Sequence, residues 1–221
     1  MTSKILCLVA LLLVSGCTTA QPVDRADVKV SVEPPPQPQL PEWRTIAKKE
    51  DQSAIDALGA RWASALAAVK AWRKPAVTAE GKLLEADAAL VRPLPPPGRY
   101  RCRTLRFTGT QGGFQSFQPW FCFVEEEGDL TILTKATGSD RPQGRLWPDG
   151  EKRLIFLGST LRGPEGPAPA YGDSPDTDTA GVCERVGDFQ WRLVVPRGGN
   201  DLDIIELVPD VAPPSPPPSW R

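Results

Sequence analysis

Apolar and polar positions follow two different periods along the chain, and the change of period divides it into two parts. From Asp51 to Arg73, apolar residues recur every three or four positions, which predicts one buried face of a helix. We expect Asp51 to cap this helix, Pro75 to end it, and a shorter helix to cover 80–90. The stripe, which we expect to pack in the core, consists of Ile55, Leu58, Trp62, Leu66, Val69 and Trp72.

Beyond residue 98 the pattern changes to short apolar runs separated by turn sequences. Turns such as Gly128-Asp129 and Asp149-Gly150 are typical of hairpins. An open sheet of this size would leave a long unpaired edge. We therefore predict an α+β, mainly β fold, in which a helical segment precedes an antiparallel eight-stranded barrel-like or strongly curved sheet; a two-layer sandwich is the alternative. The expected strands cover 99–107, 119–125, 130–136, 143–147, 152–158, 181–186, 190–195 and 202–208.

The N-terminal residues have the pattern of an export signal. Lys4 precedes an apolar run over 5–14, which as a helix would span only about 15 Å, half of a bilayer core. We therefore expect 1–16 to be a signal peptide. Its end resembles a bacterial lipobox, made of Val14, Ser15, Gly16 and Cys17.

The lipobox resemblance implies that Cys17 receives diacylglycerol and anchors the chain to a membrane. Thr18, rather than aspartate, follows the cysteine. Under the sorting rule that belongs to the resemblance, this residue favours the periplasmic face of the outer membrane in a bacterial envelope. An ordinary signal peptide with an incidental cysteine is the alternative.

Proline, with 25 residues, is concentrated in segments that lack large apolar side chains. Such segments cannot bury enough surface to fold. We expect 17–41 to be a tether after the signal peptide, and 210–221 to be a solvated tail or, alternatively, a proline-rich ligand motif. Between them lie the helical segment, 42–92, and the β domain, 93–209.

Composition excludes several classes of chemistry. Histidine is absent, so a Ser-His-Asp triad, a Cys-His pair and a histidine metal site cannot form. The net charge of −1 speaks against a general nucleic-acid binder, which needs an excess of Lys and Arg. Acidic residues are numerous, but none has the spacing of a calcium loop. We expect no catalytic residue, no metal and no cofactor.

The cysteines point to one disulfide. Cys102 and Cys122 have their midpoint at Gly112, and a hairpin that is symmetric about this glycine would place them directly opposite each other. We therefore predict a Cys102–Cys122 disulfide and a free, buried Cys183; three free thiols are the alternative.

Two features are candidates for binding. Arg99, Arg101 and Arg103 alternate along one face of the first expected strand. They could form a cationic stripe for an anionic ligand or lipid surface, or a solvent-facing row paired with acids. Tyr171 lies in the middle of 159–178, a stretch with four prolines and no period, which could be a binding lid.

A series of short motifs carries a family resemblance. Arg101 and the two paired cysteines lie in Tyr-Arg-Cys-Arg and Phe-Cys, and later motifs include Thr-Gly-Ser-Asp-Arg-Pro-Gln-Gly at 137–144 and Trp-Arg-Leu at 191–193. Taken in order, the motifs resemble the domain-of-unknown-function 4893 family of bacterial envelope proteins over roughly 41–209. That family has no established activity, so the resemblance implies no catalytic residue. Gly98-x-Tyr100 is weakly similar to the Gly-x-Trp of calycin barrels, with Tyr in place of Trp.

These observations favour a non-enzymatic binding module. We expect a small apolar ligand or a protein partner at the mouth of the barrel, membrane attachment through the lipid, and no nucleic acid. A structural or assembly component of the envelope is the alternative. A hydrolase that uses carboxylates alone would need two acids facing each other across a cleft.

Overall fold

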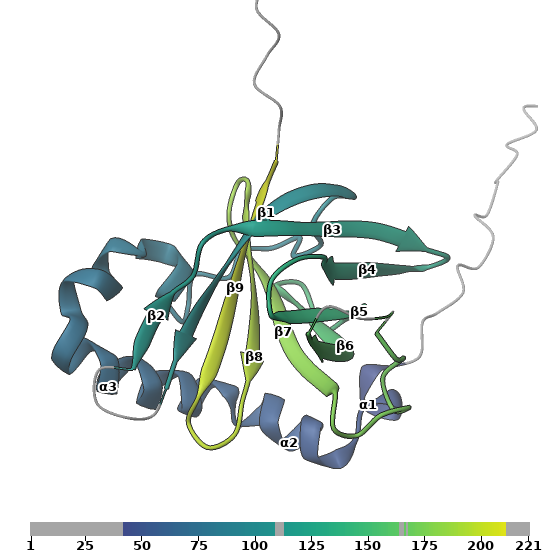
Figure 1. The fold of residues 1–221 in the computed structure, drawn as a ribbon, viewed down its shortest axis with the longest axis horizontal. Helices are drawn as coiled ribbons and strands as arrows, with labels where there is room; N and C mark the ends of the chain where they lie inside the picture. The colour runs from purple at the N-terminus through teal and green to yellow at the C-terminus, as the bar shows by residue number, and fades with distance from the viewer. Residues whose placement is uncertain (1–41, 109–112, 164–165, 167, 211–221) are drawn as a thin grey trace, which may run out of the picture. The chain divides into compact units, whose positions relative to one another are not determined.

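The described part of the chain folds around a closed antiparallel β-barrel (Figure 1). The computed structural model describes residues 42–108, 113–163, 166 and 168–210. Within these residues, eight strands close into a barrel because the first strand also pairs with the last, and a short ninth strand extends the sheet beside the first. The strands are β1 (Gly98–Phe107), β2 (Phe114–Ser116), β3 (Trp120–Glu127), β4 (Leu130–Lys135), β5 (Asp140–Pro148), β6 (Arg153–Arg162), β7 (Asp178–Gly187), β8 (Gln190–Pro196) and β9 (Leu202–Pro209).

All eight expected strands are present, and the pairing of β1 with β9 confirms the barrel rather than the sandwich. The extra strand β2 was not expected, because three residues are too few to show a period. It pairs with the second half of β1, while β3 pairs with the first half. The unpatterned stretch at 159–178 is shorter than expected, since β6 extends to Arg162.

Two facing glycines let β5 and β6 approach closely where the barrel wall bends. Gly144 lies opposite Gly158 in the register of these strands. A Cβ atom on Gly158 would lie 2.1 Å from the carbonyl oxygen of Gln143, and one on Gly144 would lie 2.5 Å from the Cα of Gly158. No side chain fits at either position, so both glycines are required by the close contact of the two strands.

Helices cover one side of the barrel (Figure 1). They are α1 (Trp43–Ile46), α2 (Lys49–Asp56) and α3 (Leu58–Ala79), followed by a 3-10 turn, η1 (Gly81–Leu84). The expected single helix from Asp51 is therefore two helices that meet at Ala57, and Asp51 lies inside α2 instead of capping it.

The helix breaks at Arg73, close to Pro75 as expected, but a second helical stretch that contains Pro75 follows the break. Arg73 has non-helical backbone angles, φ −129° and ψ 31°, and the chain resumes a helical path that carries Pro75 to Ala79. Proline is tolerated there because the first turn of a helical stretch does not need its missing N–H. Trp72, just before the break, was expected to pack in the core, but it is 63% exposed.

The expected helix over 80–90 is also wrong, because the four-residue turn η1 takes its place. Gly81 has a φ of 53°, outside the right-handed helical region. Leu83 and Leu84 are both buried, and adjacent positions cannot both lie on one narrow helix stripe. Leu90 instead forms an isolated bridge with Arg185 of β7.

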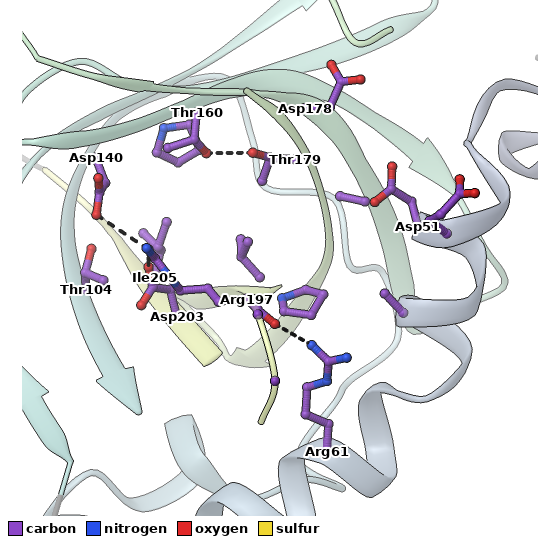
Figure 2. A pocket seen from close by; sticks show the side chains of 18 of the residues that line it. Asp51, Arg61, Thr104, Asp140, Thr160, Asp178, Thr179, Arg197, Asp203 and Ile205 are labelled. Atoms are coloured by element: carbon purple, nitrogen blue, oxygen red, sulfur yellow. Dashed lines mark hydrogen bonds and ion pairs between the residues drawn. The ribbon is translucent and has the colours of Figure 1, made fainter. Parts of the chain in front are cut away.

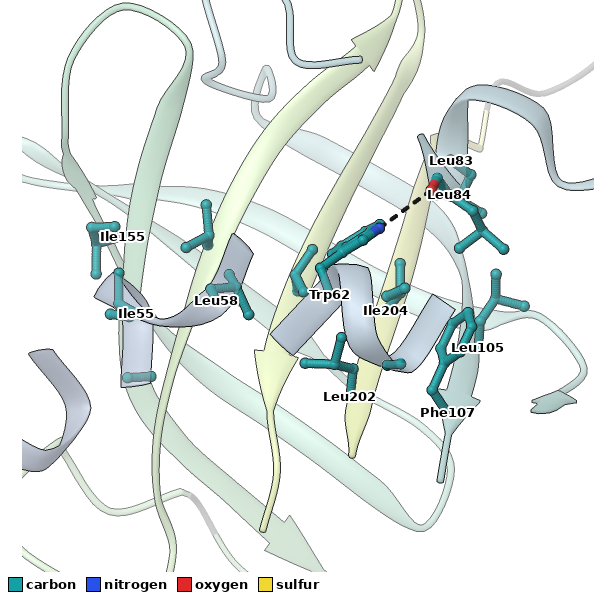
Figure 3. Packing of buried hydrophobic residues seen from close by; sticks show 14 of the residues in the cluster. Ile55, Leu58, Trp62, Leu83, Leu84, Leu105, Phe107, Ile155, Leu202 and Ile204 are labelled. Atoms are coloured by element: carbon teal, nitrogen blue, oxygen red, sulfur yellow. Dashed lines mark hydrogen bonds between the residues drawn. The ribbon is translucent and has the colours of Figure 1, made fainter. Parts of the chain in front are cut away.

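The apolar side chains form two cores, one on each side of the barrel wall. We call the first the inner cluster: Tyr100, Cys102, Cys122, Val124, Leu133, Leu146, Leu154, Phe156, Cys183, Trp191, Leu193, Ile205 and Leu207. The outer cluster joins the helices to the outside of the wall, and Figure 3 shows Trp62 of α3 and Leu83 of η1 packed over Leu105, Leu202 and Ile204. Successive residues of a strand face opposite sides, so strands such as β1, β6 and β9 supply both cores.

A buried arginine holds the helical segment on the barrel. Arg192 of β8 is 1% exposed and forms an ion pair with Glu184 of the neighbouring strand at 2.7 Å. Its Nη1 donates to the carbonyl oxygens of Leu83 at 3.0 Å and Glu85 at 2.6 Å. The guanidinium also lies 4.6 Å from the ring centre of Trp62. One side chain therefore binds backbone carbonyl groups at the end of η1, pairs with Glu184 of the sheet and lies over the Trp62 ring of α3.

The predicted disulfide is confirmed, but its register is not. Cys102 and Cys122 are bonded, with their Cα atoms 5.8 Å apart. Cys122 lies opposite Tyr100, and Cys102 opposite Trp120, so the cysteines pair diagonally rather than face to face. The inserted strand β2 makes the connection asymmetric about Gly112. Cys183 is free and buried inside the barrel, and burial raises the pKa of its thiol to about 12.

We expect Arg192→Gln to lower the free energy of unfolding by about 3 kcal/mol, because Glu184 and the η1 carbonyl groups would lose a buried charged partner. Urea denaturation measures this loss. Arg145→Gln is the control, since its ion pair with Glu127 is about half exposed and such pairs contribute at most about 1 kcal/mol. Equal losses in the two variants would contradict the role given to Arg192.

Thiol counting tests the disulfide. A chain beginning at Thr18 should expose one reactive thiol, that of Cys183, when it is unfolded in guanidinium without reductant, and three thiols after reduction. The folded chain should react slowly, because the thiol is buried and protonated at neutral pH. Three thiols before reduction would show that the bridge does not form.

Candidate functional site

One end of the barrel opens into a pocket of about 450 Å³ between the strand ends and α2. We call this pocket the mouth. Figure 2 shows Asp51 on the helix at one side, and Asp140 and Asp203 on strands at the other. Arg61 of α3 donates to the carbonyl oxygen of Arg197 at 2.7 Å, which joins the helix to the β8–β9 connection. The mouth is also lined by Glu50, Thr104, Thr160, Arg162, Asp178 and Thr179.

The inward positions of β1 explain why the mouth is polar. Tyr100 and Cys102 belong to the inner cluster, so every second residue after them also faces inward. The next two inward positions are Thr104 and Arg106, and Arg106 bonds with acids of the mouth. The inside of the barrel therefore changes from apolar at one end to charged at the other.

Arginines and aspartates form a network on one wall of the mouth. Arg106 contacts both carboxylate oxygens of Asp203 at 2.7 Å, and its Nη2 contacts Asp140 at 2.6 Å. Arg197 adds a contact to Asp203 at 2.6 Å and one to Asp140 at 3.6 Å. Arg162, which is largely exposed, lies 3.9 Å from Asp140. The network links β1, β5, β6, β9 and the connection after β8.

The network holds Asp140 and Arg106 in their charged forms. Burial acts to raise the pKa of Asp140, but the hydrogen bond from Arg106 and the charges of Arg106, Arg197 and Arg162 outweigh it, so the pKa is lowered. The hydrogen bond with Asp203 raises the pKa of Arg106 further above its usual value. Asp140 is therefore ionised at neutral pH and has no proton to donate to a substrate.

A buried lysine holds the backbone of Asp140 in place. Lys135 of β4 is 6% exposed, and its Nζ donates to the carbonyl oxygens of Thr137 and Asp140, each at 2.8 Å. Burial lowers the pKa of this ammonium group. Gly138 lies in the same turn with a φ of 95°, and a Cβ atom there would lie 2.7 Å from Nζ. The turn therefore needs both the lysine and the glycine.

The loop that contains Tyr171 is fastened to α2. The Tyr171 hydroxyl accepts a hydrogen bond from the backbone N–H of Lys48 at 2.9 Å and donates one to Asp51. Burial and then the hydrogen bond with Asp51 raise the pKa of Tyr171. Lys48 also forms an ion pair with Asp178, whose other oxygen accepts from the backbone N–H of Gly172. Tyr171 thus lies beside the mouth, and its hydroxyl is used to close the loop on the helix.

The three arginines singled out in the sequence do not converge on the mouth. Arg103 is held by Glu80 at 2.6 Å and Glu206 at 2.8 Å, on the outer side of β1. Arg99 pairs with Asp210 at 2.7 Å. The guanidinium groups of Arg99 and Arg101 lie 5.4 and 5.0 Å from the ring centre of Phe121. The structure thus places this row on the outside of the wall, next to acids and an aromatic ring.

Sequence reasoning missed the charged wall of the mouth, in which Asp140, Arg197 and Asp203 line the pocket and Arg106 and Lys135 hold them. A signal was present for two of these residues. Arg106 and Asp203 are charged, and the alternation of β1 and β9 assigns both to the inner face. A charge at an inward position of a barrel strand indicates either a buried ion pair or a lined opening.

The described residues contain no group of three His, Cys, Asp or Glu side chains that could hold a metal ion. Nor does any helix within them have the length and apolar character needed to cross a membrane. The acids of the mouth contact arginines, a lysine and a tyrosine, as described above. Chemically, the arrangement presents fixed charges of both signs and hydroxyl groups to a small molecule.

A family model described as "Domain of unknown function (DUF4893)" matches residues 43–207. No curated protein and no solved structure gave a match. The matched segment begins at the first helix and runs into β9, so it includes the helices, nearly all of the barrel and every side chain of the mouth. Because this segment makes up about three quarters of the sequence, the chain belongs to the DUF4893 family of domains of unknown function.

Proposed function

We propose that this protein is a non-enzymatic binding module that takes a small polar ligand at the mouth of the barrel. The observation that carries the proposal is the pocket of about 450 Å³, whose size lies within the range of small-molecule sites. Its wall is held rigid by the network around Arg106, and a rigid site loses little entropy when a ligand binds.

The distribution of apolar and charged groups supports a polar ligand rather than the apolar one expected from the sequence. Beyond the mouth, the interior of the barrel is filled by the inner cluster, in which Phe156, Leu193 and Leu207 are fully buried. The mouth itself lies over the charged part of the interior. An apolar ligand there would bury charged groups without offering them partners, which costs free energy.

The charges of the mouth favour a ligand that carries both signs. Arg162 and Arg197 lie on the strand side, while Glu50 and Asp51 come from the helix side. Figure 2 shows the open space between these two sides. A zwitterion of suitable length can place its carboxylate near the arginines and its ammonium near the helix acids.

The same network supports a binding role over hydrolysis by carboxylates. A carboxylate-only hydrolase needs one acid that keeps a proton near neutral pH. Asp140 has the opposite tendency, because arginines lower its pKa. Asp203 faces two arginines as well.

Three probes of similar length test the ligand class by calorimetry on the full chain: 6-aminohexanoate, hexanoate and hexylamine. We expect 6-aminohexanoate to bind at least about five times more tightly than either singly charged probe, because it alone pairs with both walls. Similar binding of all three, or binding of none, would contradict the proposal.

Two variants locate the binding. Arg162→Gln should weaken 6-aminohexanoate about three- to tenfold by removing an exposed cation from the rim, without disturbing Arg106. Arg145→Gln, on another part of the barrel, should leave the affinity unchanged. An equal effect of both variants would place the binding outside the mouth.

We also propose that Cys17 carries a lipid that attaches the module to the periplasmic face of the outer membrane. Val14, Ser15, Gly16 and Cys17 lie outside the described residues, so the support for this attachment is their resemblance to a lipobox. The tether 17–41 would then hold the barrel up to about 75 Å from the bilayer.

The lipid can be tested by detergent partition of the expressed full chain. Cys17→Ala should move the protein from the detergent phase to the aqueous phase, since two or more acyl chains make membrane attachment stable. Cys7→Ala should partition as the unchanged chain does, because Cys7 belongs to the expected signal peptide. Unchanged partition of Cys17→Ala would disprove the anchor.

A further inference from the structure

A second pocket, of about 570 Å³, lies at the end of the barrel opposite the mouth. It is formed by the start of β1, the β7–β8 turn, the end of β9 and the segment before β1. We call it the aromatic pocket; its apolar lining consists of Leu94, Pro96, Pro97, Tyr100, Phe189 and Trp191. Phe189 is 73% exposed and Leu94 is 51% exposed, so this end of the molecule presents large apolar side chains to its surroundings.

Trp191 lines the aromatic pocket, but its indole N–H is buried and not accessible from the pocket. Trp191 is 3% exposed, and its Nε1 has no acceptor among the described residues. The neighbouring Tyr100 packs edge-on against it, with ring centres 6.0 Å apart, but the Tyr100 hydroxyl already donates to the carbonyl oxygen of Pro96 at 2.5 Å. The pocket therefore favours an occupant whose rings or apolar groups pack against aromatic side chains.

The chain itself supplies such a segment at the rim of the pocket. Pro209 and Asp210 line the pocket, and the backbone N–H of Asp210 donates to the carbonyl oxygen of Arg99 at 2.9 Å. The Asp210 carboxylate also pairs with Arg99 at 2.7 Å, which fixes the point where the tail begins. The eleven residues that follow, 211–221, read Val-Ala-Pro-Pro-Ser-Pro-Pro-Pro-Ser-Trp-Arg and lie outside the described residues.

We propose that the proline-rich tail of this chain docks into its own aromatic pocket, where its proline rings pack against Tyr100, Phe189 and Trp191. The rings of polyproline II segments pack well in grooves lined by aromatic side chains. Residues 211–218 in this conformation reach about 25 Å, which is ample to cross the pocket.

Connectivity favours the chain's own tail over a foreign proline-rich peptide. A segment tethered at the rim has an effective concentration in the millimolar range, which a free peptide must exceed to compete. A partner's peptide and the tail of a second copy are the other possible occupants, and the experiment below separates them. The proposal does not depend on the mouth or on its ligand, since the two pockets share no residue.

The experiment follows the indole N–H resonances of the full chain by two-dimensional NMR. The chain has seven tryptophans, and Trp191→Phe identifies the signal of Trp191 by its loss. Replacing the tail prolines by glycine keeps the tail length but removes the preference for polyproline II; the substitutions are Pro213→Gly, Pro214→Gly, Pro216→Gly, Pro217→Gly and Pro218→Gly. We expect the Trp191 signal to shift, because the tail no longer packs beside its ring, while the Trp62 signal is unaffected.

Two single variants in the described part of the chain serve as a matched pair. Phe189→Ala removes an exposed wall of the pocket and should also shift the Trp191 signal. Trp72→Ala removes a similarly exposed aromatic residue from α3 and should leave that signal unchanged. A synthetic peptide of residues 211–221, added to the proline-to-glycine chain, should restore the original signal, and Phe189→Ala should weaken this titration about tenfold.

The outcomes distinguish the occupants. A Trp191 signal that is the same in the original and proline-to-glycine chains overturns the proposal, even if added peptide binds, because the pocket would then serve a partner. A shift that depends on protein concentration, with a dimeric mass in solution, also overturns it in favour of a second copy. A concentration-independent shift in a monomer supports docking of the chain's own tail.

Discussion

The pairing of β1 with β9 is the constraint on which the rest of the molecule depends. Both ends of the barrel, and both pockets, exist only because these strands, about a hundred residues apart in the sequence, lie side by side. Two opposite-charge pairs mark their register: Arg106 lies opposite Asp203 on the inner face, and Arg103 lies opposite Glu206 on the outer face. A slip by one residue would exchange the two faces of the strand and separate both pairs. The same contacts therefore specify the fold and form a wall of the mouth.

Local sequence patterns were sufficient to predict the strands of this fold, but not the features that arise when these elements pack together. The eight strands, the closed sheet and the Cys102–Cys122 bond all follow from alternation, turn residues and spacing, which act over short distances along the chain. The misplaced elements are those in which packing outweighs local preference. The carbonyl groups of Leu83 and Leu84 accept from Arg192 and Trp62, which hold them in a turn rather than a helix. Trp72 is left outside the core where the helix breaks at Arg73.

The mouth was less accessible to sequence reasoning, for a physical reason. Its charged groups come from β1, β5, β9 and the connection after β8, and no local motif joins them. What links them is the closure of the barrel, so the site becomes visible only after the register is known. The row of arginines at Arg99, Arg101 and Arg103 attracted attention because it is local. In the structure Arg99 and Arg103 pair with acids outside the wall, and Arg99 and Arg101 lie over the ring of Phe121.

The position of the free Cys183 affects how the Cys102–Cys122 disulfide forms. Cys183 lies in β7, sixty-one residues beyond Cys122, and once the barrel closes no oxidant reaches its sulfur. If the chain enters an oxidising environment with its N-terminal end first, Cys102 and Cys122 become exposed before Cys183. They can then pair with each other before Cys183 can compete. The order of emergence thus favours the native bridge, and a chain oxidised all at once from the unfolded state lacks this advantage and can trap Cys183 in a mispaired form.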